Sequence, residues 1–193
     1  MGNFTRSLFA FVIAVFTCFT AISQTTFTNS SVMTIGTGAA AGASLYPSPI
    51  VVSGLSSTIA NVTVTLTNCN HTFPDDLDIM LVAPNGDAFY LVSDCNGGND
   101  WVNTNYIISD AAAAAFANTA LNATGSYRPT NFGASDVMTG ATPTTGANPA
   151  TAGTATFASV FGGDAHNGTW NLYVVDDATG AAASIGGRSI TIT

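Results

Sequence analysis

The sequence predicts an all-β domain, an antiparallel β-sandwich, from three observations. First, Val62, Val64 and Leu66 alternate with threonines, which is the period of two expected of a strand with one buried face. Second, a continuous apolar run at residues 77–82 ends at a Pro-Asn-Gly turn at residues 84–86. Third, the rest of the chain repeats this pattern, with short apolar runs between Gly, Pro and Asn turns and almost no helical period.

The elements outside this hairpin are weaker signals. Residues 24–48 contain one strand-like cluster, so we expect a flexible lead-in with a single edge strand there. Asp110 precedes five alanines as a good N-cap, which predicts one or two helical turns. Residues 139–154 are low-complexity Thr, Gly, Pro and Ala, and we expect a mobile loop that gains little from burial. Further strands are expected at residues 50–55, 88–93, 106–108, 170–175 and 189–193.

The first 23 residues have the pattern of a secretory signal peptide. Arg6 precedes an apolar run at residues 8–19, and small residues follow at 21–23. The run is too short and wrongly flanked for a stable membrane span. We therefore predict a secreted, extracellular protein with a signal peptide at 1–23, a lead-in at 24–48 and one sandwich at 49–193.

The charge of the chain limits its partners. All 11 acidic residues are aspartates, lysine is absent, and removal of residues 1–23 leaves two arginines and so a net charge of −9. Such a surface repels a phosphate backbone, so nucleic acid is excluded as a partner, and an anionic membrane surface is disfavoured for the same reason. Cations are the natural counter-charge.

Two cysteines, Cys69 and Cys95, remain after the signal peptide is removed. In an exported protein, two cysteines most simply form a disulfide, and these two lie in loops that we expect to be adjacent. Two free thiols and a metal-binding pair are the alternatives.

Several ordered motifs resemble the P domain (P/Homo B domain), the β-sandwich found beside subtilisin-like catalytic domains in proprotein convertases and secreted bacterial proteases. The matching stretches are residues 71–73 (HTF), 76–81 (DLDIML), 83–86 (APNG), 125–129 (GSYRP) and 167–177 (NGTWNLYVVDD). The resemblance implies a jelly roll of the galactose-binding-like type that is not itself catalytic, and a protease partner supplied as a separate chain. Residues 187–189 (GRS) stand where the family usually has a tryptophan.

We assign no catalytic residue. The mature chain has two histidines, His71 and His166; neither lies near a nucleophile-elbow pattern, and no subtilisin nucleophile motif occurs. We expect His71 to bond backbone groups and His166 to lie in an exposed loop.

The aspartates favour a calcium site, because Ca²⁺ takes six to eight oxygen ligands from loop carboxylates and carbonyls. Asp76, Asp78, Asp94 and Asp176 lie at predicted strand ends, which a jelly roll would bring to one end of the sandwich. The alternative is that these carboxylates accept backbone N–H bonds at loop corners. We also expect Arg128 to be partly buried, paired with an aspartate and packed beneath an aromatic ring.

Trp101 and Tyr106 flank an acidic loop and are candidates for stacking on a sugar, although aromatic residues near loops more often close a core, as we expect of Trp170. Three functions follow. The first is a non-catalytic module that stabilises or docks onto an extracellular protein, such as a protease. The second is a calcium- or carbohydrate-binding surface module. The third is a structural subunit that self-associates through edge strands.

Overall fold

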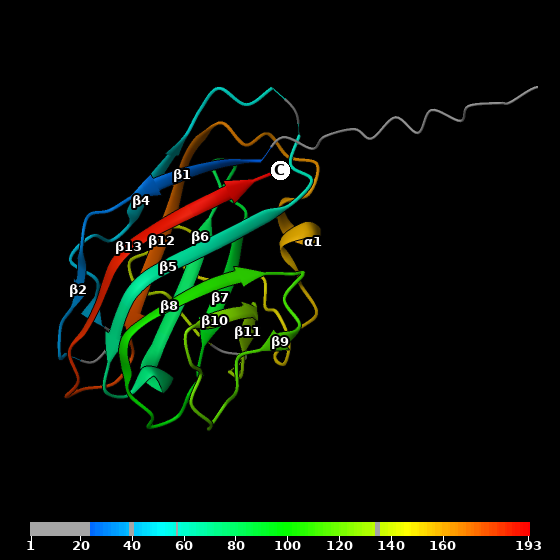
Figure 1. Ribbon diagram of the computed structural model, residues 1–193. Helices are drawn as coiled ribbons and strands as arrows, with labels where there is room; N and C mark the ends of the chain where they lie inside the picture. Colours follow the sequence, from blue (N-terminus) through cyan, green and yellow to red (C-terminus); the bar gives the residue numbers. More distant parts are fainter. Residues whose placement is uncertain (1–23, 39–40, 57, 134–135) are drawn as a thin grey trace, which may run out of the picture.

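The computed structural model describes residues 24–38, 41–56, 58–133 and 136–193, which form two β-sheets stacked face to face (Figure 1). The predicted signal peptide lies outside the described residues. The seven-stranded sheet has the order β1 (Thr25–Asn29), β13 (Ala183–Ile192), β5 (Val62–His71), β8 (Trp101–Ser109), β10 (Gly125–Arg128) and β9 (Ala114–Ala115), with β2 (Met33–Ile35) also on β13. The six-stranded sheet has the order β11 (Thr130–Asn131), β7 (Ala88–Ser93), β6 (Leu77–Val82), β12 (Gly168–Asp176) and β3 (Ala41–Gly42), with β4 (Ser48–Val52) also on β12.

The predicted all-β, two-sheet architecture is confirmed. The long ladders are antiparallel, but the short strands β10 and β11 pair in parallel with β8 and β7, so the purely antiparallel expectation is wrong at this side of the molecule. The jelly-roll and galactose-binding-like assignment stays a prediction.

The core lies between the sheets. Val62, Val64 and Leu66 of β5 are fully buried and face it, as their alternation predicts. Trp170 of β12 is also fully buried and packs edge-to-face on Phe161 at a centroid distance of 5.0 Å, which confirms its predicted core role.

A bulge in β5 turns the side chain of Cys69 towards the core. Asn68 has φ 53°, and the pairing of β5 with β8 shifts register between Leu66 and Cys69. This shift turns Cys69, rather than Asn68, into the core, because inserting a residue reverses the side-chain alternation beyond it. Cys69 is therefore inside β5, not in a loop beyond it. Cys95 follows β7 of the other sheet, where its thiol donates to the carbonyl oxygen of Ser93 at 3.1 Å.

The predicted disulfide is wrong: Cys69 and Cys95 are both buried free thiols. We expect both to react with an alkylating agent in denaturant without reductant, giving one label on each of Cys69 and Cys95 by mass spectrometry. The native protein should label slowly, because burial raises the pKa of the Cys69 thiol to about 12 and also raises that of Cys95. A denatured chain that needs reductant before it takes up label would contradict this expectation.

The lead-in is part of the sandwich and not a flexible segment. Strand β1 pairs with β13 along its whole length, from Thr25 opposite Ile192 to Asn29 opposite Arg188, and Phe27 packs against the core. Local sequence does not reveal this strand, because the strand with which it pairs, β13, lies at the other end of the chain.

The predicted helix at residues 110–116 is also wrong. Ala114 and Ala115 form the short strand β9, and the single α-helix of the described residues is α1 (Phe157–Phe161). Pairing with β10 outweighs the modest helix propensity of a short alanine run. Asp110 still acts as a cap, but for α1: its two carboxylate oxygens accept from the backbone N–H groups of Phe157 and Ala158, each at 3.0 Å.

Residues 139–154 are not the weakly packed loop that their composition predicts. Met138 and Ala141 are buried against Met80 and Tyr90, on the face of the six-stranded sheet that points away from the main core. Ala147 also bonds the backbone of β7, donating to the Ala88 carbonyl at 2.8 Å. The loop thus covers an apolar sheet face that would otherwise be exposed.

Arg188 of β13 is a buried charged residue of the sandwich. Its side chain is 1% exposed, its Nη1 donates to the Ser31 carbonyl, and burial lowers the pKa of its guanidinium. Among the residues that the structure describes, no helix is long and apolar enough to cross a membrane.

Candidate metal centre

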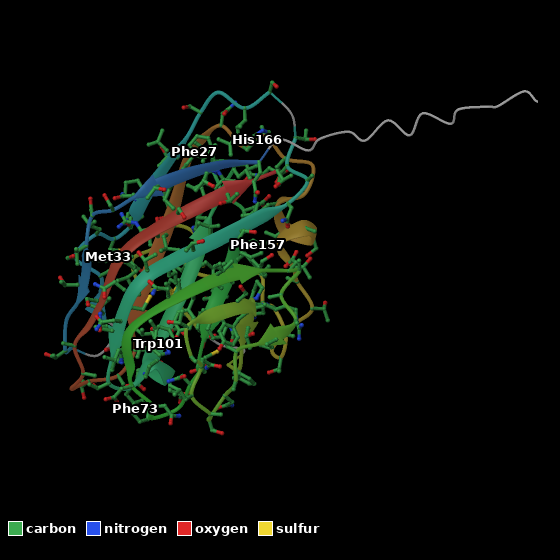
Figure 2. The ribbon with its side chains drawn as sticks, viewed as in Figure 1. Phe27, Met33, Phe73, Trp101, Phe157 and His166 are labelled. Carbon is green, nitrogen blue, oxygen red and sulfur yellow. The ribbon has the colours of Figure 1, made fainter. Side chains whose placement is uncertain are left out.

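Aspartates gather at the end of the sandwich where β6 begins and β7 and β12 end, the end at which Figure 2 labels Phe73. This follows from antiparallel pairing. Leu77 at the start of β6 lies opposite Asp176 at the end of β12, and Ile79 lies opposite Val92 near the end of β7. Residues that are far apart in sequence but flank these strand ends therefore lie near one another.

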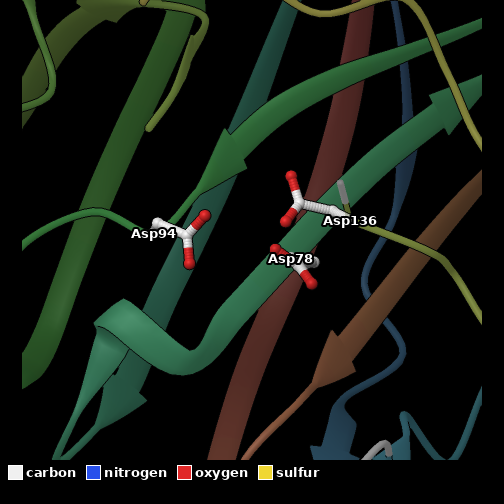
Figure 3. Close-up of side chains that lie close together, drawn as sticks. All are labelled: Asp78, Asp94 and Asp136. Atoms are coloured by element: carbon white, nitrogen blue, oxygen red, sulfur yellow. The ribbon is translucent and has the colours of Figure 1, made fainter. Parts of the chain in front are cut away.

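Three of these carboxylates form a group that could hold a metal ion. Asp78 is the second residue of β6, Asp94 follows β7, and Asp136 lies in the loop after β11. One carboxylate oxygen from each lies within 4.8 Å of the other two, and Figure 3 shows the three side chains converging from these segments. Among the described residues no other group of acidic, histidine or cysteine side chains meets this criterion.

The surroundings orient the three carboxylates. The Ser93 hydroxyl donates to Asp78 at 2.5 Å, and the Asn131 amide donates to Asp136 at 2.8 Å. Gly133 lies directly against the group: a Cβ atom built there would meet an oxygen of Asp94 and would come within 2.8 Å of Oδ1 of Asp136. A glycine at 133 thus lets the carboxylates of Asp94 and Asp136 approach the backbone more closely than any larger residue would allow.

The pKa values of Asp78 and Asp94 are both raised, which shows that the protein opposes negative charge at these two carboxyls. Burial, opposed by the Ser93 hydrogen bond and reinforced by Asp136 and other nearby carboxylates, raises the pKa of Asp78 to about 8. Burial and repulsion from Asp136 raise the pKa of Asp94 to about 6. In the absence of a cation the native state therefore disfavours ionisation of both carboxyls, and of Asp78 more than Asp94.

Two of the four predicted metal ligands, Asp78 and Asp94, lie in this group. Asp76 and Asp176 lie at the same end of the sandwich but outside it, and Asp136 was not predicted. Asp136 follows no strand pattern, and its approach to Asp94 depends on how the loop after β11 folds back. No local sequence signal reveals that contact.

Asp176 is instead the partner of His71. The Nε2 of His71 lies 3.1 Å from Oδ2 of Asp176, and both side chains are buried. Because the Nδ1 of His71 accepts from the backbone N–H of Phe73 at 2.8 Å, the proton of a neutral ring must lie on Nε2 and be donated to Asp176. The other oxygen of Asp176 accepts from the Ala178 N–H at 3.1 Å. The predicted backbone contact of His71 is confirmed, and the pair closes the end of the core.

Other sequence expectations fail on burial. Trp101 and Tyr106 are 2% and 0% exposed, with ring centroids 4.9 Å apart inside the core, so neither offers a face to a sugar (Figure 2 labels Trp101). His166 is 3% exposed and not in an exposed loop, and its carbonyl accepts from the Trp170 indole at 3.0 Å. Trp101, Tyr106 and His166 are buried although polar residues flank them in the sequence.

No protein-family model matches the sequence, and no curated protein matches it. Two crystal structures resemble the chain: the serine protease of Aeromonas sobria, with 12% identity and a TM-score of 0.42, and the Aeromonas sobria serine protease in a complex with the chaperone, with 12% identity and a TM-score of 0.40. Each match covers 89% of this chain and 26% of the other, so this chain spans about a quarter of that protease. Likenesses at this level assign neither a family nor an activity.

Proposed function

We propose that this chain is a calcium-binding β-sandwich module, with Asp78, Asp94 and Asp136 as the carboxylate ligands. The observation that carries the proposal is the convergence of three carboxylate oxygens within 4.8 Å. Oxygens on opposite sides of a Ca²⁺ ion lie about 5 Å apart, since each Ca–O bond is about 2.3–2.6 Å. The donor set is entirely oxygen, which favours calcium or magnesium over zinc or copper.

Bound calcium would act structurally. It would neutralise the repulsion among the three carboxylates and tie the loop that carries Asp136 to the ends of β6 and β7. The close approach of Asp94 and Asp136 to Gly133 and the raised pKa values of Asp78 and Asp94 support this role, because they indicate crowded carboxyl groups that a cation would relieve.

Calcium is expected to raise the thermal midpoint of the protein. A ligand at about 100 times its Kd stabilises by roughly 2.7 kcal/mol, which is a shift of several degrees for a domain of this size. The comparison is millimolar calcium against sodium chloride of matched ionic strength, because any salt screens repulsion in so acidic a chain. Differential scanning fluorimetry gives both midpoints.

Two variants, each with a matched control variant, test whether calcium binds at this group of carboxylates. Asp136→Asn should abolish the calcium-specific shift, whereas Asp100→Asn, an exposed aspartate outside the group, should retain it. Gly133→Ala should also lose the shift because its Cβ would collide with oxygens of Asp94 and Asp136 and displace them, while Gly38→Ala, with nothing within 4 Å, should not. Equal shifts in calcium and sodium chloride would refute the proposal.

A second function is favoured by the motifs at residues 76–81 and 167–177, which resemble a P domain. These segments form β6 and β12, which pair directly, with Tyr173 opposite Met80, so the resembling residues make up one continuous part of the six-stranded sheet. We propose on this basis a secreted, non-catalytic module that docks onto an extracellular protein such as a protease. The test is whether affinity-tagged protein, expressed in its own host, co-purifies with a protease.

The proposed absence of catalysis gives a direct prediction. The purified protein should not cleave casein or a dibasic peptide, because the buried His71 is engaged by Phe73 and Asp176 and has no nucleophile among its hydrogen-bond partners. Cleavage that persists through purification and disappears in His71→Ala, with the fold intact by circular dichroism, would overturn the proposal.

A further inference from the structure

A pocket of about 250 Å³ is lined by residues of β9 and β10 and of the segment that leads into α1, and it includes none of the three carboxylates of the acidic group. Its walls are largely aliphatic, with Ala115, Pro129, Ala150 and Ala155 among the lining residues. Two charged side chains, Arg128 and Asp110, also line it.

Arg128 is held in one orientation by backbone carbonyls. Its Nη1 donates to the carbonyl oxygens of Ala112 at 2.9 Å and Ala113 at 2.7 Å. The predicted pairing of Arg128 with an aspartate is wrong, because in the described part of the chain no carboxylate lies within 4.0 Å of it. The predicted partial burial is wrong too, since the side chain is exposed.

This arrangement leaves a defined set of donors. A guanidinium has five N–H groups; the two on Nη1 are engaged, and the three on Nε and Nη2 have no partner among the described residues. The Nε and Nη2 edge is the fork that binds a carboxylate with two parallel hydrogen bonds.

Asp110 does not compete for this fork. Both of its oxygens accept backbone N–H groups at the start of α1, and the carboxylate makes no ion pair with Arg128. The other arginine of the described residues, Arg188, is buried in the sandwich. Arg128 is thus the one exposed arginine in the described part of an otherwise acidic surface.

We propose that this pocket binds the free C-terminal carboxylate of a peptide whose last side chain is small and apolar. Arg128 receives the carboxylate through Nε and Nη2, and the aliphatic wall around Ala155 receives the terminal side chain. A chain terminus suits the pocket better than an internal acidic side chain, because it presents a carboxylate and a small apolar group on the same carbon atom. The choice of a peptide as the ligand rests on the proposed docking role. The proposed calcium site plays no part in it.

Isothermal titration calorimetry with N-acetyl-Gly-Ala-Val tests the inference. The peptide with a free carboxylate should bind, and its C-terminal amide should bind at least tenfold more weakly, because the amide cannot accept two charge-assisted hydrogen bonds. Arg128→Gln should abolish binding, and Arg128→Lys should weaken it at least tenfold, since an ammonium lacks the planar fork. Ser126→Ala, an exposed position on the same strand that does not line the pocket, is the matched control and should bind normally.

A second variant tests the apolar wall without altering Arg128. Ala155→Leu should fill the pocket and weaken binding, and thermal midpoints of all variants establish that they are folded. Three outcomes would each overturn the inference. The free acid and the amide could bind equally well, a folded Arg128→Gln variant could bind as tightly as the wild type, or N-acetyl-Ala-Asp-Ala amide could bind as tightly as the peptide with a free C-terminal carboxylate. Peptide titrations in calcium and in chelator separate peptide binding from the metal proposal, because the pocket residues do not include the proposed metal ligands. A protein partner recovered by co-purification would support the docking role even if these peptides did not bind.

Discussion

Asp78→Asn is expected to make the metal-free protein more stable at pH 8, by on the order of 3 kcal/mol in the free energy of unfolding. Asp78 is 4% exposed, and its pKa rises to about 8 in the native state from the ordinary value of 3.8. Native burial therefore opposes ionisation, which the unfolded chain permits freely. An asparagine can still accept from Ser93 and carries no charge, so the variant avoids this cost.

The same pKa difference sets the direction of the pH dependence. A carboxyl whose native pKa is raised contributes stability that is fully present below about pH 4, and this contribution is lost as the pH rises to about 8. Asp94, with a native pKa of about 6, adds to the loss over the lower part of this range. The chelator-treated wild-type protein should therefore lose stability progressively as the pH rises from about 4 to about 8.

Urea unfolding in chelator at pH 5 and pH 8 measures both effects. The stabilisation by Asp78→Asn should be large at pH 8 and small at pH 5, whereas Asp100→Asn, an exposed position, should change stability by less than about 0.5 kcal/mol at either pH. With saturating calcium the order should reverse, because the variant lacks a metal ligand. If Asp78→Asn were destabilising in chelator at pH 8, the inference that burial opposes ionisation of Asp78 in the native state would be wrong.

Asp176→Ala is expected to lower the free energy of unfolding by about 3 kcal/mol. The substitution leaves the buried Nε2–H of His71 without an acceptor and removes the acceptor of the Ala178 N–H. Leaving a buried donor unpaired costs its full desolvation free energy, and the loss of the carboxylate adds a small cavity.

Two comparisons make this prediction specific. Asp176→Asn retains an acceptor for one of the two donors and should cost about 1 kcal/mol, roughly one hydrogen bond. Asp177→Ala, at the adjacent exposed position, should be neutral or slightly stabilising because it only relieves repulsion. Equal losses for Asp176→Ala and Asp177→Ala, measured by urea unfolding at pH 7, would show that the buried pair contributes nothing.

The alternation of β5 and the apolar run of β6 were sufficient to predict the two-sheet class and the central strands. These signals are local: a period of two, or a turn at Pro84-Asn85-Gly86, depends only on neighbouring residues. For the same reason the sequence identified strand ends rich in aspartate, and with them Asp78 and Asp94.

Where the sequence failed, a distant partner determined the local structure. The alanines after Asp110 became a strand because β10 lies beside them, and Asp110 caps a helix 47 residues further along. The lead-in is a strand because β13 is available to pair with it. Trp101 lies inside the core although a polar loop precedes it.

The sequence by itself determined that the chain forms a β-sandwich, that it is strongly acidic, and that carboxylates cluster at its strand ends. Only the tertiary structure decided which carboxylates meet: Asp136 joins Asp78 and Asp94, while Asp176 is engaged by His71. It also decided that Cys69 faces the core and that Arg128 lines a pocket with only its Nη1 bonded among the described residues. The physical reason is that a strand pattern is fixed by the residues of that strand, whereas a site is formed by side chains from several strands and loops, whose approach depends on the packing of the whole chain.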